Sequence, residues 1–181
     1  MEAQTLYQKA IIFAADKHIG QKLPGGELPY VVHLSNVAME IVIAAFNSDN
    51  FNLDFALQVA LLHDTVEDTA TTFGELENKF GIEIAKAISA LTKNKELPKQ
   101  QQMQDSLTRI KILQKEVWAV KLADRITNLQ KPPFNWDNDK KIKYKVEAYI
   151  ILSELKAGNE FLANRLEAKI KEYGKYINQG L

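Results

Sequence analysis

The chain has 181 residues, of which 46% are hydrophobic, and its 23 Lys and Arg residues balance its 23 Asp and Glu residues. This length and apolar content favour a single domain over residues 1–181, and the zero net charge argues against a broad basic surface for nucleic acid. Cysteine is absent, which excludes disulfides, thiolate nucleophiles and Cys-based metal sites, so any metal would need His and carboxylate ligands.

No run of 18 or more apolar residues occurs, and the N-terminus lacks the charged, apolar and small-residue regions of a leader. We therefore expect neither a membrane span nor a signal peptide. The default expectation is a cytoplasmic protein that acts on a small molecule, and the pattern leaves its oligomeric state open.

Hydrophobic residues recur at helical spacing along the chain, and no segment alternates with a period of two. Glycine, proline and asparagine fall between the apolar stripes, where helices should end. The polar segment 93–104 is interpreted as a loop or the start of a helix. The sequence thus predicts an all-α fold, with helices around residues 6–14, 37–45, 55–66, 80–91, 107–113, 117–129, 142–155 and 161–170.

The first candidate metal ligand is His33, which lies in an apolar stretch from Tyr30 to Ala38. An imidazole buried there needs a polar partner or a metal ion to offset the loss of water. The alternative is an ordinary core histidine with a hydrogen-bond partner.

The segment 60–69, Ala-Leu-Leu-His-Asp-Thr-Val-Glu-Asp-Thr, places four metal-competent or acid–base side chains after an apolar run. On a helix, His63 and Glu67 share one side, as do Asp64 and Asp68, so all four can converge on one cavity. A mixed set of imidazole and carboxylate ligands suits manganese, iron or zinc better than calcium. The alternative is a helix end that frays into a solvated polar loop.

A third carboxylate, Asp124, interrupts the apolar helical segment from Val120 to Leu129. It is either a metal ligand or the partner of an ordinary ion pair with Lys121. Asn128 follows at helical spacing and can face the same cavity. We assign Arg125 to a structural ion pair.

The order His33, then His63-Asp64, then Asp124 resembles the HD superfamily of metal-dependent phosphohydrolases. From about residue 14 to about residue 144, the three segments are similar to the hydrolase domain of the RelA/SpoT enzymes. They are also similar to stand-alone small alarmone hydrolases such as the metazoan SpoT homologue. The resemblance implies one HD-type hydrolase domain over residues 1–181, folded as a compact helical bundle of about 8–10 helices.

The resemblance further implies one divalent metal, usually manganese in that family, bound by His33, His63, Asp64 and Asp124. The implied reaction removes the 3′-pyrophosphate from the alarmones ppGpp and pppGpp, the nucleotides of the stringent response. The metal would lower the pKa of a bound water and polarise a phosphoryl oxygen. Two acids are then the catalytic candidates: Glu67 takes or relays the proton and Asp68 orients the water.

Four carboxylates around one divalent ion would repel a polyphosphate, so the substrate needs cations nearby. Lys22, Lys99 and Lys121 are the nearest candidates in sequence, and the alternative for each is a solvated surface charge. The resemblance places Lys99, Asn128 and Tyr144 near the nucleotide. These five residues form the expected substrate-binding set.

The segment from Gln21 to Tyr30 departs from the family pattern. Many RelA/SpoT hydrolase domains carry an Arg-Lys pair here that flanks guanine, whereas this chain has Gln21-Lys22 in a loop about one residue longer. Leu34 also replaces a proline that commonly follows the first His. Selectivity for guanine is therefore open.

Three functions remain compatible with these residues. The first is an alarmone hydrolase, and the second is an HD phosphatase for another nucleotide, such as a deoxynucleotide or the 2′-phosphate of NADPH. The third is a nucleotide-binding module without turnover. Glu67 and Asp68 argue against the third, because a sensor needs the cations more than it needs the acids.

Overall fold

The computed structural model describes residues 2–177, which form helices and no β-strand, with one isolated antiparallel bridge between Lys22 and Pro29. The all-α prediction and the expected number of helices are confirmed. No helix within the described residues combines the length and apolar character that a membrane crossing requires. The helices are α1 (Ala3–Lys17), α2 (Val31–Phe46), α3 (Leu53–Leu62), α4 (Thr65–Asp68), α5 (Phe73–Phe80), α6 (Ile82–Leu91), α7 (Lys99–Lys111), α8 (Lys115–Asn128), α9 (Asn138–Leu155) and α10 (Glu160–Tyr173), with two short 3-10 helices at Lys156–Gly158 and Gly174–Tyr176.

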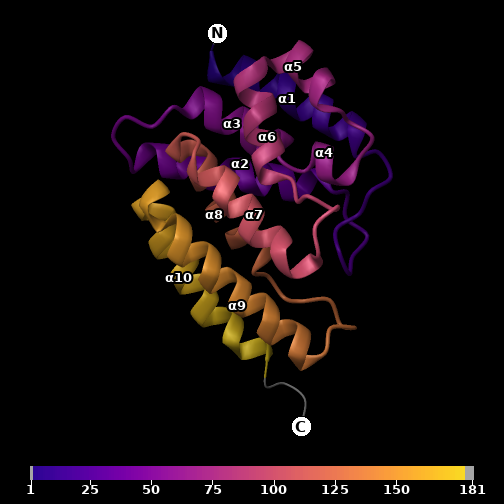
Figure 1. The fold of residues 1–181 in the computed structure, drawn as a ribbon, viewed down its shortest axis with the longest axis vertical. Coiled ribbons are helices and arrows are strands. Elements are labelled where there is room, and N and C mark those ends of the chain that lie inside the picture. The colour runs from indigo at the N-terminus through magenta and orange to yellow at the C-terminus, as the bar shows by residue number, and fades with distance from the viewer. Residues whose placement is uncertain (1, 178–181) are drawn as a thin grey trace.

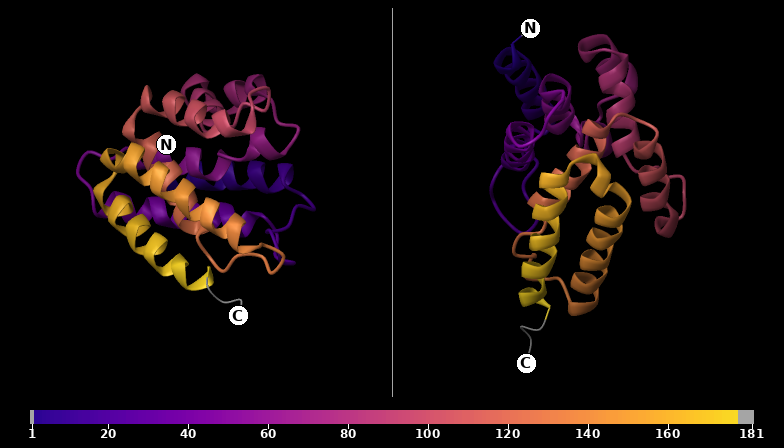
Figure 2. Two further views of the ribbon diagram at one scale, coloured as in Figure 1. Left: turned by 60° about the horizontal axis from the view of Figure 1, so that its bottom comes forward. Right: turned by 90° about the vertical axis from the view of Figure 1, so that its left-hand side faces the viewer.

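Helix α8 lies at the centre of the arrangement, where it contacts α2, α3, α6, α7, α9 and α10 (Figure 1). Its apolar side chains Val120, Leu122 and Ala123 are fully buried, as are those of α2 and α3 that meet them. Helices α9 and α10 form an antiparallel pair at the end of the molecule away from α1 and α5 (Figures 1 and 2). A polar side chain on α8 therefore lies deep in the protein and needs a partner.

Several boundaries differ from the sequence prediction, and α7, for example, begins at Lys99, within the segment interpreted as a loop or the start of a helix. The helix expected over 55–66 ends at Leu62, and the single turn α4 begins at Thr65, so His63 and Asp64 occupy the break. The apolar pattern does not predict helix α5 separately, because only a few apolar residues mark its short length. Gly81 separates α5 from α6 with a φ of 89°, a left-handed conformation that glycine adopts at little cost.

Candidate metal centre

The four candidate ligands come from three segments that are far apart in the sequence. His33 lies in the first turn of α2, His63 and Asp64 form the junction between α3 and α4, and Asp124 lies on α8. Both imidazoles and Asp124 are at least nine-tenths buried, and Asp64 is partly exposed. The packing of α2, α3 and α8 brings the four side chains together.

Their reactive atoms lie close to one another. The two Nε2 atoms of His33 and His63 are 3.3 Å apart, and Asp64 Oδ2 is 2.9 Å from the His63 Nε2. Asp124 Oδ1 is 3.4 Å from the His33 Nε2 and 3.7 Å from the His63 Nε2. Ligand atoms that share one ion at about 2.1 Å must lie about 3 Å apart, so the spacing suits a single divalent ion.

Hydrogen bonds on the outer nitrogens fix which ring nitrogen faces the cluster. His63 Nδ1 lies 2.8 Å from the carbonyl oxygen of Ala60, which can only accept, so Nδ1 carries the proton. Thr127 Oγ1 donates to the carbonyl of Asp124 and thus accepts from His33 Nδ1 at 3.3 Å. In the neutral rings, both Nε2 lone pairs point toward the carboxylates of Asp64 and Asp124. Because these groups can only accept, a cation between them would stabilise the arrangement.

The charges in the cluster perturb one another strongly. Burial lowers the pKa of His63, but the charges and hydrogen bonds of Asp64 and Asp124 outweigh it and raise this pKa to about 10. Burial raises the pKa of Asp64, but the His63 imidazolium lowers it to about 2. For Asp124, burial is outweighed by the Lys121 ammonium and the two imidazoles, which hold its pKa well below the usual range. Without a metal, a proton on imidazole is the cation that the carboxylates select.

The side chain of Asp64 faces the candidate metal site and does not cap helix α4. It occupies the N-cap of α4, where an aspartate commonly accepts a backbone N–H bond, but its side chain makes no such bond. Instead Oδ2 accepts a 2.5 Å hydrogen bond from the Tyr30 hydroxyl and faces His63. Burial and the surrounding aspartates raise the pKa of Tyr30, so it remains a donor.

Hydrogen bonds to two other segments hold the two acids that follow, Glu67 and Asp68. Glu67 Oε2 accepts from the backbone N–H of Lys93 at 3.0 Å, and its Oε1 lies 3.6 Å from the Lys93 ammonium. Asp68 Oδ2 accepts from the side-chain amide of Gln21 at 3.0 Å. Asp64 and Asp68 keep the expected helical spacing, because the Asp68 backbone N–H donates to the Asp64 carbonyl at 2.9 Å. The continuous helix expected through His63 is interrupted, because α3 ends at Leu62 and α4 begins at Thr65.

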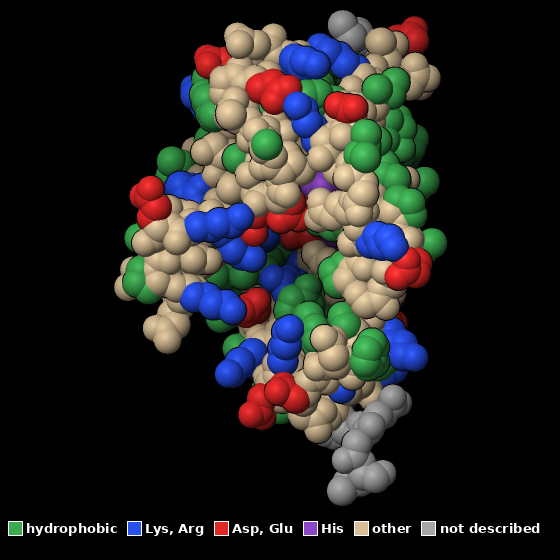
Figure 3. Space-filling model, turned by 90° about the vertical axis from the view of Figure 1, so that its right-hand side faces the viewer, with side chains coloured by type: hydrophobic (Ala, Val, Ile, Leu, Met, Phe, Trp, Pro, Cys, Tyr) green, Lys and Arg blue, Asp and Glu red, His purple; other side chains and the backbone are tan. Residues whose placement is uncertain are grey.

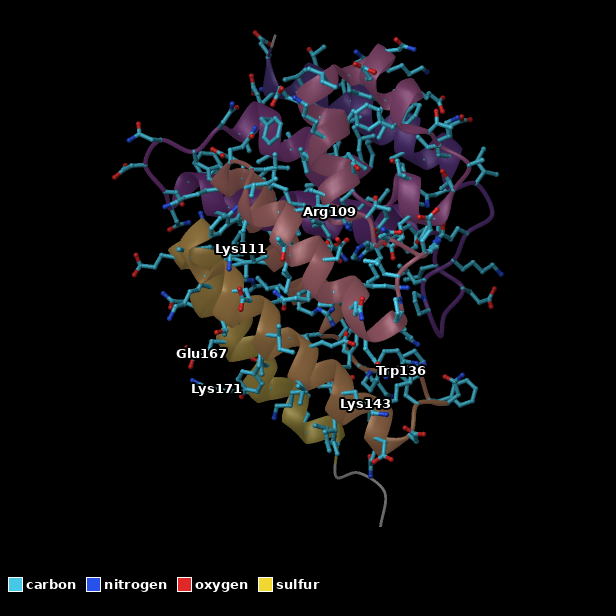
Figure 4. The ribbon with its side chains drawn as sticks, in the orientation of Figure 1. Arg109, Lys111, Trp136, Lys143, Glu167 and Lys171 are labelled. Atoms are coloured by element: carbon cyan, nitrogen blue, oxygen red, sulfur yellow. The ribbon has the colours of Figure 1, made fainter. Side chains whose placement is uncertain are left out.

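A cavity of about 280 Å³ opens beside the cluster and contains two of the predicted substrate residues, Asn128 and Tyr144, together with His33. Asn128 donates to Asp124 Oδ1 at 2.5 Å. Trp136 packs edge-on against Tyr144, with ring centroids 5.1 Å apart, beside the first turns of α9 (Figure 4). The cavity therefore combines aromatic surface with polar groups next to the cluster.

The three predicted lysines lie in different surroundings. Lys121 is buried, and its ammonium lies 3.0 Å from Asp124 Oδ2. Lys22 pairs with Glu27, and Lys99 is exposed at the start of α7. None of them lines the cavity. Their part in substrate binding remains a prediction.

Other cations near the site were missed in the sequence. Lys131 lines the cavity, and the Lys95 ammonium donates to the Glu67 carbonyl at 2.7 Å. Figure 3 shows one face of the molecule, with a hollow in which acidic and histidine side chains are visible. Lys and Arg side chains lie beside this hollow. No residue pattern marked these lysines, because only the fold brings them near the cluster.

Arg125 forms the expected structural ion pair. Its guanidinium lies 3.6 Å from Glu147 on α9 and stacks over the Tyr144 ring at 4.3 Å from the centroid. Burial is the main reason that the pKa of Tyr144 rises to about 12. The stacking ties a wall of the cavity to α8.

Comparison with known proteins agrees with this arrangement. The model of the HD domain family matches residues 10–155. The guanosine-3′,5′-bis(diphosphate) 3′-pyrophosphohydrolase MESH1 of Danio rerio is 32% identical over 92% of this chain and 93% of its own length. The MESH1 protein of Xenopus tropicalis is also 32% identical, over 93% of this chain and 95% of its own length.

A solved structure is similar as well. It is described as a metazoan ortholog of SpoT that hydrolyses ppGpp and plays a role in starvation responses. It superposes with a TM-score of 0.81 at 28% identity, covering 93% of this chain and 96% of that protein.

Proposed function

Because the chain belongs to the HD domain family, we propose that it is a metal-dependent phosphohydrolase that removes the 3′-pyrophosphate from ppGpp or pppGpp. Water is consumed, the ester bond at the ribose 3′-oxygen breaks, and GDP or GTP leaves with pyrophosphate. The observation that carries this proposal is the convergence of two imidazole lone pairs with carboxylate oxygens in a chain similar to such hydrolases over nine-tenths of its length.

His33, His63 and Asp64 form a group able to hold a divalent ion, and we propose Asp124 as the fourth ligand. Manganese is the proposed metal, since two imidazoles and two carboxylates form the mixed ligand set that suits it. A bound divalent ion supplies Lewis acidity, which lowers the pKa of water and draws charge from a phosphoryl oxygen.

The proposed catalytic acids are Glu67 and Asp68, whose carboxylates can accept a proton from the attacking water and orient it. The Lys93 backbone N–H holds one oxygen of Glu67, and Gln21 holds one oxygen of Asp68, which limits the motion of both groups. Ordered acids reach the reacting atoms without a costly search for the correct geometry.

We propose that the nucleotide lies in the cavity beside the cluster. Asn128 offers an amide to a ribose or base, and Tyr144 and Trp136 offer aromatic surface to a base. Lys131 lies in the same cavity and offers a charge to phosphate, with Lys22, Lys99 and Lys121 as the further cations predicted from the sequence. Positive charge is required there because the candidate ligands and acids carry four carboxylates.

Residues 1–181 act as one hydrolase domain, a proposal supported by the family match and by relatives of similar length. A cytoplasmic location and a part in the stringent response rest on the proposed substrate alone. The substrate is a free nucleotide, and neither nucleic acid nor a membrane is a proposed partner.

The test is a parallel incubation of the protein and manganese with ppGpp, GTP, dGTP and NADPH, with products resolved by ion-exchange chromatography. We expect equal amounts of GDP and pyrophosphate from ppGpp, and no such release after chelation of the metal. Phosphate release from NADPH or a deoxynucleotide, with ppGpp unchanged, would show that the substrate assignment is wrong.

A further inference from the structure

The segment that follows α1 makes a second set of contacts to the site. His18 is 4% exposed, and its Nδ1 lies 2.6 Å from the side-chain oxygen of Gln21. The side-chain nitrogen of Gln21 donates to Asp68 Oδ2 at 3.0 Å. The second hydrogen bond joins residues 47 positions apart in the sequence, and together the two bonds connect the end of α1 to α4.

Chemistry fixes the direction of the Gln21 amide. A carboxylate only accepts, so the NH₂ end of the amide must face Asp68. The oxygen end then faces His18, and because an amide oxygen also only accepts, the proton of His18 lies on Nδ1. One orientation of the amide satisfies both partners.

The backbone of Gln21 is fixed as well. Its N–H donates to the His18 carbonyl, and its own carbonyl accepts from the Tyr30 N–H, both at 3.0 Å. Gly20 has a φ of 80°, which reverses the chain after α1 and returns Gln21 to His18. The amide therefore extends from an anchored position and not from a free loop.

His18 also supports the metal side of the site. Its ring stacks on Tyr30 with centroids 4.8 Å apart and planes 27° apart. The Tyr30 hydroxyl donates to Asp64 Oδ2 at 2.5 Å. The buried His18 imidazole thus contacts Gln21, which holds Asp68. It also contacts Tyr30, which holds the candidate ligand Asp64.

We propose that Gln21, held by His18, is a positioning residue for Asp68. Its hydrogen bond occupies Oδ2 and leaves Oδ1, which has no hydrogen bond within residues 2–177, to face water or substrate. The role of Asp68 as an acid rests on the proposed function. The contact between Gln21 and Asp68 does not depend on that function.

A double-mutant cycle tests this role. Gln21→Met keeps the length of the side chain and removes both hydrogen bonds, so we expect kcat for ppGpp to fall about tenfold with KM and the manganese activation constant unchanged. Asp68→Ala removes the group through which Gln21 acts. Adding Gln21→Met to Asp68→Ala should then lower the rate no further, whereas independent effects that multiply would overturn the proposal.

Two further variants separate positioning from folding. Gln21→Glu still accepts from His18 but sets a second carboxylate against Asp68, so we expect it to lose more activity than Gln21→Met at a similar Tm. Gln8→Met makes the same replacement at an exposed position of α1 and should match the wild type. A loss of kcat that simply follows the loss of Tm across the variants would contradict a positioning role.

Failure of the proposed function would be visible separately. If the wild type leaves ppGpp intact, the substrate assignment is wrong, and the same cycle is measured with manganese and bis(p-nitrophenyl) phosphate. Crystal structures of the wild type and Gln21→Met give a readout without turnover. Asp68 should leave its position in the variant, and an unmoved Asp68 would overturn the proposal.

Discussion

Raising the pH should strengthen manganese binding, because the metal must displace a proton from His63. The pKa of this imidazole in the metal-free site is about 10, since the nearby aspartates outweigh the effect of burial. At pH 7.5 the protonated ring therefore outnumbers the neutral ring by about 300 to 1. Only the neutral ring offers a lone pair on Nε2 to a metal.

The direction and size of the pH effect on manganese affinity follow from the competition between the metal and the His63 proton. At a pH below the His63 pKa of about 10, the imidazole holds its proton, so manganese binding releases one proton. The manganese affinity therefore rises about tenfold for each pH unit. At pH 7.5, displacement of the proton costs about 3 kcal/mol of binding free energy. Asp64, with a pKa of about 2, is already ionised and adds no proton to the release.

Isothermal titration of the metal-free protein with manganese, between pH 6.5 and 8.5, measures the affinity at each pH and the number of protons released. Titrations in buffers of different ionisation enthalpy give the number of protons released, which we expect to be close to one at pH 7.5. An affinity that stays constant over this range, or binding without proton release, would refute the competition at His63.

Four other substitutions test separate parts of the site and core. Asp64→Ala should abolish manganese binding and turnover, whereas Glu67→Ala should keep the metal affinity and lose about 100-fold or more in kcat, both measured by titration and initial rates. Lys131→Met should raise KM for ppGpp about tenfold with kcat little changed, because it removes a charge that lines the cavity. Ile41→Ala, at a fully buried position of α2, should lower the free energy of unfolding by about 2–5 kcal/mol in urea denaturation.

Matched variants give the contrast for the lysine and the isoleucine substitutions. Lys86→Met removes a lysine that pairs with Glu83 away from the cavity, and its KM should equal that of the wild type. Ile112 is 81% exposed, so Ile112→Ala should change the stability by no more than about 0.5 kcal/mol. Full activity in Asp64→Ala or Glu67→Ala, or equal effects of the two isoleucine variants, would contradict these assignments.

Helical periodicity predicted most of the fold, because long amphipathic stripes such as that of α8 repeat over several turns. It failed at the junction of α3 and α4, where the helically spaced apolar stripe continues from Leu62 to Val66 although the helix ends at Leu62. Periodicity records which face is buried, and it does not record a break that turns Asp64 toward the imidazoles.

The candidate ligands could be found in the sequence because His33 and Asp124 stand out as polar residues in apolar segments. The residues around them could not be found in this way. Gln21 is a polar residue in a polar loop, and Lys131 follows the end of a helix, so neither is unusual locally. Their importance comes from contacts between distant segments, such as Gln21 with Asp68.

A crystal structure of the protein with manganese, recorded at a wavelength where the ion scatters anomalously, tests the proposed metal centre most directly. We expect one anomalous peak about 2.0–2.3 Å from the Nε2 atoms of His33 and His63 and from a carboxylate oxygen each of Asp64 and Asp124. A peak elsewhere, or none at a saturating concentration of manganese, would contradict the metal centre proposed for this protein.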